Sequence, residues 1–130
     1  MTNNGEQNGK IVSFTQLRSW QKARELTTEI YRATSLFPKE EKFGLSSQLR
    51  RSAVSVPGNI AEGFSRNTAK DKAQFYSISL GSLTETLSHL YIAQDLGFIK
   101  KTDLAMLEEK VINLHKMING LIKSAQGRNT

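Results

Sequence analysis

Apolar residues recur every three or four positions along most of this chain, and no long run of alternating apolar and polar residues interrupts them. This spacing puts apolar side chains on one face of a helix, so it predicts α-helices rather than strands. Segments 15–37, 41–62, 69–96 and 103–123 carry the pattern. The last is the most regular, with a seam like that of a coiled coil: Leu104, Leu107, Val111, Leu114, Ile118 and Leu121. We therefore expect an all-α protein, an antiparallel up-down-up-down four-helix bundle.

Residues that favour helix ends fall near the boundaries of these segments. Ser13 and Gln16 fit a capping box, and Thr68 is a favourable N-cap for the third helix. Gly63 and Gly97 are each followed by a phenylalanine, which is typical of a helix that ends on a left-handed glycine. Together with Pro38, which prevents a clean continuation of the first helix, these signals predict short connections between four helices.

Pro57 lies inside the second predicted helix and removes one backbone donor. It either kinks this helix or divides it near Ser55. The apolar positions stay in phase on both sides of the proline, which favours a kink: Leu45, Leu49, Ala53, Val56 and Ile60.

The length of 130 residues suits one domain. We expect a flexible N-terminal tail over 1–12, the bundle over 13–124 and a disordered C-terminal tail over 125–130. No apolar run is long enough for a membrane span, and no signal-peptide segment is recognised near the start. The chain has no cysteine, which excludes disulfides and thiolate metal sites. These features predict a cytoplasmic, bacterial-type protein without a membrane partner.

The chain has 18 Lys and Arg against 12 Asp and Glu, a formal net charge of +6. This balance favours a polyanionic partner. In an up-down-up-down bundle one end collects most of the surplus cations: Lys10, Arg18, Arg66, Lys70, Lys72, Lys123 and Arg128. We predict a nucleic-acid interface there that contacts the phosphate backbone through Arg18, Arg66, Lys70, Lys72 and Lys123. The alternative is a solubilising end without a partner.

A polar stripe follows one face of the second helix, roughly 120° from the centre of its apolar face. Its residues are Gln48, Arg51, Ser52, Ser55, Asn59, Glu62 and Arg66. Short polar side chains suit close packing with hydrogen bonds, so we predict a network between helices or subunits that includes Arg51, Ser55, Asn59 and Glu62. Direct contact with nucleic acid and plain solvation remain open. On the third helix, Phe75 and Ile78 lie off the main apolar stripe and are candidates for an oligomer contact.

No pattern in the chain predicts catalysis. His89 and His115 fall on different helices, without the Glu-x-x-His or His-Glu-x-x-His spacing of bundle metal sites. Gly58 and Gly63 have the spacing of a phosphate-binding loop, but Phe64 and Ser65 follow where that loop needs Lys and Ser or Thr. We therefore expect no enzyme, no metal and no cofactor.

Residues 48–63 read QLRRSAVSVPGNIAEG, and further features are the WQKA of residues 20–23, the FPKEE of 37–41 and the GSLTE of 81–85. Together they resemble the four-helix-bundle proteins found in intervening sequences of bacterial large-subunit ribosomal RNA genes. That family is similar to the accessory variability proteins of diversity-generating retroelements. The resemblance implies a homo-oligomer, with a pentamer as one form, and structured RNA or RNA/DNA as partner. A second function also stays open: an accessory subunit that binds a reverse transcriptase.

Overall fold

The computed structural model describes residues 6–7 and 10–127. The elements are β1 (Glu6–Gln7), β2 (Lys10–Ile11), the 3-10 helices η1 (Phe14–Gln16) and η2 (Lys39–Glu41), and the α-helices α1 (Arg18–Thr34), α2 (Leu45–Ser65), α3 (Ala69–Asp95) and α4 (Lys101–Gly127). The predicted all-α four-helix fold is confirmed. No helix in the described part of the chain is long and apolar enough to cross a bilayer.

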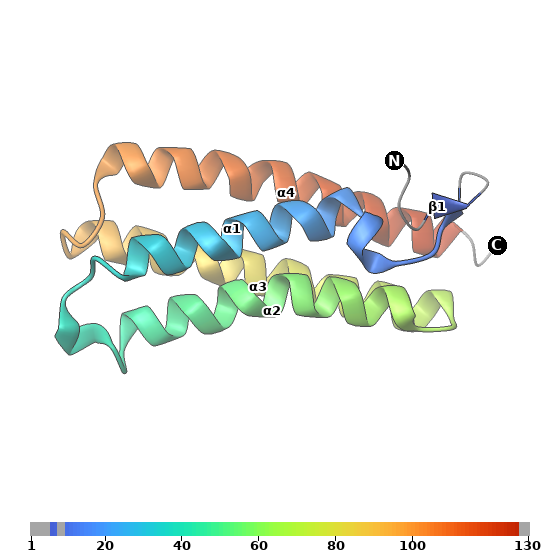
Figure 1. Cartoon of the computed structure of the whole chain (residues 1–130), viewed down its shortest axis with the longest axis horizontal. Coiled ribbons are helices and arrows are strands. Elements are labelled where there is room, and N and C mark those ends of the chain that lie inside the picture. The colour runs from blue at the N-terminus through green and yellow to red at the C-terminus, as the bar shows by residue number, and fades with distance from the viewer. Residues whose placement is uncertain (1–5, 8–9, 128–130) are drawn as a thin grey trace.

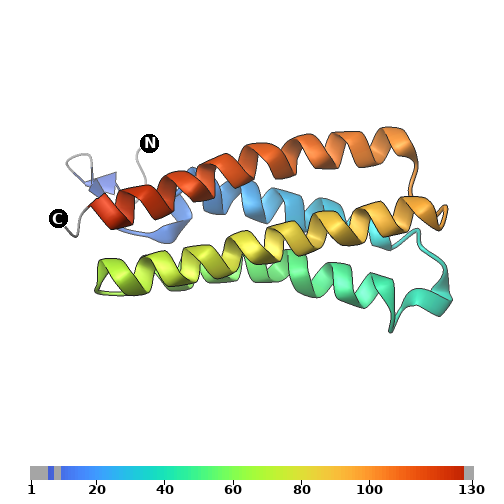
Figure 2. The ribbon, with the colours of Figure 1, turned by 180° about the vertical axis from the view of Figure 1, so that it is seen from behind.

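The four α-helices lie side by side and run along the bundle in alternating directions (Figures 1 and 2). The α2–α3 pair packs most extensively, followed by α3–α4 and α1–α2, whereas α1 and α4 touch only sparsely. The start of α1, the α2–α3 turn and the end of α4 therefore share one end of the bundle (Figure 1). The sparse α1–α4 packing leaves a groove on this side of the bundle.

The core consists of one apolar stripe from each helix, as the three- and four-residue spacing predicts. Its largest fully buried apolar side chains are Leu26, Ile30, Leu49, Val56, Ile60, Leu83, Leu90, Leu114 and Ile118. Tyr91 on α3 is exposed, and its hydroxyl donates a hydrogen bond to the Glu108 carboxylate on α4. This bond raises the pKa of Tyr91, because it stabilises the protonated phenol next to a negative charge.

Three of the predicted helix-end signals are confirmed. Ser13 and Gln16 form a reciprocal capping box at η1, and the Thr68 hydroxyl accepts a hydrogen bond from the Asp71 amide at the start of α3. Gly97 has a left-handed φ of 79°. The next amide, that of Phe98, donates to the Ala93 carbonyl at 2.8 Å, and the Phe98 ring packs on the core.

The predicted left-handed cap at Gly63 is wrong. Gly63 is buried inside α2, which continues to Ser65, and Gly97 is the only glycine in the described residues with a positive φ. A Cβ at Gly63 would lie 2.7 Å from Cε1 of Tyr76 and 3.2 Å from the Lys72 carbonyl oxygen. Glycine is therefore required here by the close approach of α3, not by backbone conformation.

Ordered structure extends beyond the boundaries expected from sequence toward both termini. Glu6–Gln7 pairs antiparallel with Lys10–Ile11 inside the segment predicted as a flexible tail. Toward the C-terminus α4 continues through residues 125–127, because Ala125 is buried against the core. Residues 1–5, 8–9 and 128–130 lie outside the described part.

Pro57 does not divide α2, which runs without interruption from Leu45 to Ser65. A proline lacks the N–H that would bond the carbonyl four residues earlier, which here belongs to Ala53. The Thr27 hydroxyl of α1 lies 3.1 Å from this carbonyl oxygen and 2.8 Å from that of Ala23. The neighbouring helix thus supplies a donor to the acceptor that the proline leaves unpaired. The bend expected at Pro57 stays a prediction.

Replacing Thr27 by valine is expected to lower the free energy of unfolding by about 1–2 kcal/mol, because it keeps the shape but removes the donor to Ala53. In a Pro57→Ala background, where the residue 57 amide can bond that carbonyl, the same change should cost clearly less. A double-mutant cycle from denaturant unfolding measures the difference. Equal losses in both backgrounds would show that the hydroxyl does not compensate for the proline.

Candidate nucleic-acid interface

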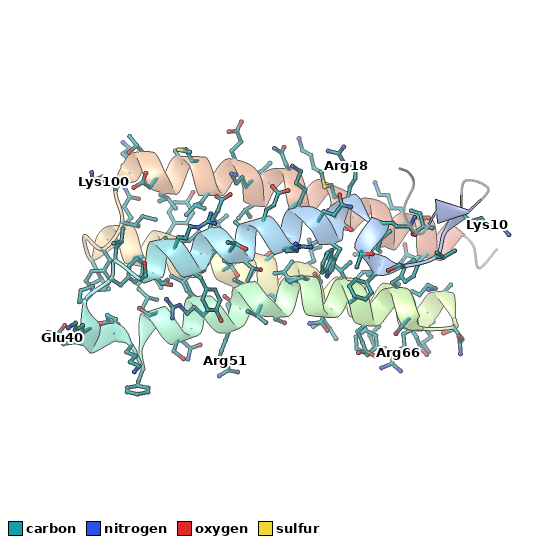
Figure 3. All side chains as sticks on the ribbon, viewed as in Figure 1. Lys10, Arg18, Glu40, Arg51, Arg66 and Lys100 are labelled. Carbon is teal, nitrogen blue, oxygen red and sulfur yellow. The ribbon has the colours of Figure 1, made fainter. Side chains whose placement is uncertain are left out.

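The cations predicted to bind nucleic acid lie toward one end of the bundle. Figure 3 shows Lys10, Arg18 and Arg66 toward this end, and Glu40 and Lys100 at the other. We call this end the basic pole and define it by Lys10, Arg18, Arg66, Lys70, Lys72 and Lys123. Arg128, also predicted there, lies outside the described residues.

A groove between α1 and α4 extends the positive surface away from the pole. It has a volume of about 500 Å³, and its polar lining includes Arg18, Lys22, Lys116 and Asn113. Lys123 follows Lys116 by seven residues, so the two lysines share a face of α4 about 10 Å apart along the helix. We call Arg18, Lys22, Lys116 and Lys123 the basic track. Sequence reasoning did not include Lys22, which follows Arg18 by one helical turn, or Lys116, which only the open α1–α4 packing brings beside Arg18.

Carboxylates offset part of the charge in this groove. Lys22 Nζ lies 3.6 Å from Glu25 Oε1, and Lys110 Nζ donates to Glu29 Oε2 at 2.7 Å. The hydrogen bond to Glu29 raises the pKa of Lys110.

Three exposed members of the track keep their charge unopposed. Arg18, Lys116 and Lys123 make no ion pair in the described part of the chain. Each is therefore available to a phosphate group without first breaking an internal salt bridge.

Two of the five predicted nucleic-acid contacts are already engaged near the α2–α3 turn. Arg66 Nη2 lies 2.7 Å from Glu62 Oε2, and its guanidinium stacks 4.5 Å from the centre of the Phe75 ring. Lys72 Nζ donates to the Phe64 carbonyl at 2.7 Å and so satisfies a backbone acceptor at the end of α2. Lys70 is exposed.

The predicted set is also divided in space. Arg18 and Arg66 point away from each other on opposite sides of the bundle (Figure 3). A ligand on the basic track would therefore contact Arg18 without reaching Arg66.

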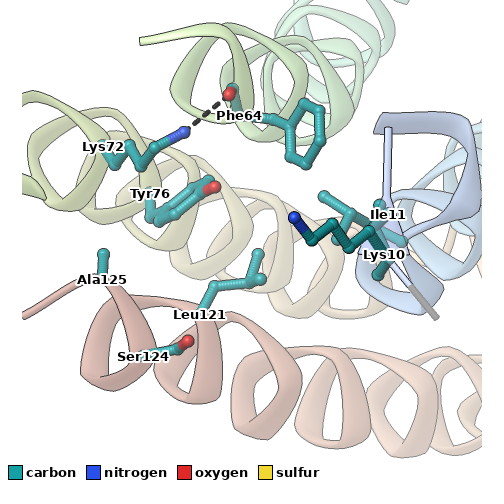
Figure 4. Close-up of a pocket in the computed structure, with 9 residues that line it drawn as sticks. Lys10, Ile11, Phe64, Lys72, Tyr76, Leu121, Ser124 and Ala125 are labelled. Carbon is teal, nitrogen blue, oxygen red and sulfur yellow. Dashed lines mark hydrogen bonds between the residues drawn. The ribbon is translucent and has the colours of Figure 1, made fainter. Parts of the chain in front are cut away.

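A hollow of about 580 Å³ opens at the basic pole (Figure 4). Its walls are mainly apolar, and they include Leu17, Phe64, Tyr76, Leu121 and Ala125. Two lysines also line it: the Lys10 side chain reaches across the opening, whereas the Lys72 ammonium turns to the Phe64 carbonyl (Figure 4). The hollow therefore has less cationic character than the basic track.

Part of the predicted polar stripe forms a hydrogen-bonded seam between α2 and α3. Ser55 Oγ lies 2.8 Å from Ser82 Oγ, and Asn59 Nδ2 donates to the Ser55 hydroxyl at 2.9 Å and to its carbonyl at 2.8 Å. Further along, the buried Thr86 hydroxyl donates to Ser52 Oγ at 2.8 Å. Ser55 and Asn59 thus lie in a network between helices of the same chain.

The other stripe residues lie outside this seam. Gln48 and Arg51 are exposed, and Glu62 pairs with Arg66 on its own helix. The seam instead includes Ser79, whose hydroxyl donates to the Val56 carbonyl at 2.8 Å. Small residues in the middle of α3, over residues 77–82, permit this close contact.

The two candidates for an oligomer contact differ in exposure. Ile78 is 46% exposed, whereas Phe75 is half-buried and lies beneath the Arg66 guanidinium. Their role between subunits stays a prediction.

The two histidines make local contacts on separate helices. His89 Nε2 lies 3.1 Å from Glu85 Oε2, and His115 Nδ1 lies 3.1 Å from Asn119 Nδ2. Among the described residues, no group of three or more His, Cys, Asp or Glu side chains is placed to hold a metal ion.

Residues 15–120 match the family model of the 23S rRNA-intervening sequence protein. The chain belongs to this family. The match spans nearly all of the helical bundle, which confirms the family resemblance seen in the sequence. No curated protein matches the chain.

A solved structure supports the fold of this 23S rRNA-intervening sequence family member. It is a protein of unknown function from the S23 ribosomal protein family of Bacteroides thetaiotaomicron, with a TM-score of 0.75 and 23% sequence identity. The match covers 81% of this chain and 95% of that one. Neither match names a retroelement protein, so that part of the resemblance stays a prediction.

Proposed function

We propose that this protein binds structured RNA or an RNA/DNA duplex through the phosphate backbone, using the basic track. The observation that carries the proposal is the row of exposed cations, Arg18, Lys116 and Lys123, that face solvent without ion pairs in the described part of the chain. Cations that approach phosphates release condensed counterions, which drives binding without reading sequence. The family name, which refers to 23S rRNA, gives the proposal a consistent context.

The chemistry of the groove favours phosphate contacts over base contacts. Its lining consists of cationic side chains, Asn113, Glu25 and the aliphatic Leu114 and Met117, with no aromatic ring. Single strands are usually held by bases stacked on aromatic rings. A double-stranded or folded nucleic acid, which presents phosphates at its surface, therefore fits this groove better.

Replacing Arg18, Lys116 and Lys123 together by glutamate is expected to weaken binding of a labelled RNA hairpin by more than about 100-fold at low salt. The slope of log affinity against log salt should fall by about 2–3, because each lost phosphate contact removes close to one unit. Fluorescence anisotropy between 50 and 300 mM KCl, as rough limits, measures both quantities.

The matched control carries the same charge change at the other end of the bundle. Lys39, Lys100 and Lys101 are exposed there, and their replacement by glutamate should leave most of the affinity and the slope intact. If both triple variants lose the same affinity, the effect comes from net charge and not from the basic track. A wild-type slope near zero would remove the proposal.

A further inference from the structure

A second cationic surface lies on the α1–α2 side, away from the basic pole. A shallow hollow of about 600 Å³ is lined there by two aromatic rings and three cations, together with Ser47, Val54 and Ser55. We call Tyr31, Lys42, Phe43, Arg50 and Arg51 the aromatic–cation patch. Residues from α1, from α2 and from the connection between η2 and α2 meet in it.

The rings of this patch face solvent. Phe43 is 90% exposed and Tyr31 is 42% exposed. Lys42 Nζ lies 5.5 Å from the centre of the Phe43 ring, and the Arg50 guanidinium lies 4.6 Å from that of Tyr31. An aromatic side chain as exposed as Phe43 contributes little to the fold and is accessible to a ligand.

Arg50 is held in place before any ligand arrives. Its Nε donates to the Thr34 hydroxyl at 2.8 Å, and its Nη2 donates to the Tyr31 carbonyl at 3.3 Å. A guanidinium already held against a ring loses little conformational freedom on binding. The patch therefore has one ordered stacking platform, Arg50 on Tyr31, and one free ring, Phe43.

The charge of the patch favours an anionic occupant. Three cations line the hollow, and no carboxylate does so. Glu41, which precedes Lys42 in the chain, turns its Oε1 to the Leu45 amide at 3.0 Å and so caps the start of α2. Arg51 is exposed and makes no ion pair in the described residues.

We propose that the aromatic–cation patch binds unpaired bases of a single-stranded nucleic acid, with one base stacked on Phe43 and a neighbouring phosphate held by Arg51. Exposed rings interleaved with cations are the combination that single-strand binding uses, because every base has a π-face and every linkage a negative charge. A second copy that docks through the same patch is a poorer occupant, because it would bring two sets of cations together with no lining carboxylate between them. The proposal does not depend on the basic track.

The test compares two probes of equal charge: a single-stranded oligouridine of about 12 nucleotides and an abasic ribose-phosphate strand of the same length. The wild-type protein should bind the strand with bases about tenfold more tightly, which corresponds to stacking of one base. Phe43→Ala should reduce this ratio to near one, and Phe43→Tyr should preserve it. Leu36→Ala is the matched control, because Leu36 is 84% exposed and does not line the patch.

Each other outcome overturns the proposal. Equal binding of both strands by the wild-type protein, or a ratio unchanged by Phe43→Ala, removes the stacking role. If Phe43→Ala lowers the oligomeric mass in sedimentation and leaves the ratio unchanged, the patch is a contact between copies.

The basic-track triple variant separates the two proposals. It should weaken binding of the RNA hairpin and keep the ratio between the two single strands. A failure of phosphate binding by the track is therefore distinguishable from a failure of stacking on Phe43.

Discussion

Replacing Leu83 by alanine is expected to lower the free energy of unfolding by about 3–5 kcal/mol. Leu83 is fully buried on α3, the helix that packs extensively against both α2 and α4. Truncation removes apolar contacts and leaves a cavity that three helices cannot close without moving. Single-domain proteins are stable by only about 5–15 kcal/mol, so this loss is a large share of the total.

Urea unfolding followed by circular dichroism measures the effect of Leu83→Ala. Met106→Ala is the control, because Met106 lies on α4 and is 62% exposed, and it should change stability by less than about 0.5 kcal/mol. Similar losses for the two variants would contradict the central position of Leu83.

Replacing Gly63 by alanine is expected to lower the free energy of unfolding by about 1–3 kcal/mol. The added Cβ would lie 2.7 Å from Cε1 of Tyr76, a buried ring, and 3.2 Å from the backbone carbonyl oxygen of Lys72. The Lys72 carbonyl belongs to the backbone of α3 and cannot move away without separating α2 from α3. The strain should exceed the gain in helix propensity, which is about 1 kcal/mol for this change.

Gly58→Ala is the matched control, because both glycines lie inside α2. A Cβ at Gly58 meets nothing within 4 Å, so only the propensity gain remains, and we expect stabilisation by about 0.5–1 kcal/mol. Thermal unfolding of the two variants should shift in opposite directions. A shift in the same direction would show that the close contact of Gly63 with α3 does not limit side-chain size.

The helices and most of their ends could be predicted from the sequence because they depend on neighbours in the chain. The capping box of Ser13 and Gln16, the Thr68 cap and the left-handed Gly97 each satisfy backbone groups a few residues away. The cap predicted at Gly63 was wrong because a glycine followed by a phenylalanine can either end a helix or let a neighbouring helix pack closely. The residues next to Gly63 in the sequence do not show where the Tyr76 ring lies.

The candidate site was predicted only in part. The sequence indicates which end of the bundle carries surplus charge, but Arg66 and Lys72 are already paired or capping there. Lys116 joins Arg18 because α1 and α4 pack sparsely, which no periodicity reveals. Whether a cation is free to bind a phosphate group depends on distances between helices, and packing sets these distances.

The sequence by itself determined four amphipathic helices, their order and the total charge, because propensity, capping and periodicity act over a few residues. Tertiary structure decided which polar groups meet: Thr27 with the Ala53 carbonyl, Ser55 with Ser82, and Arg50 with Tyr31. Each of these pairs joins different helices. Their contact depends on the rotation and spacing of whole helices, which only the packing of the complete core fixes.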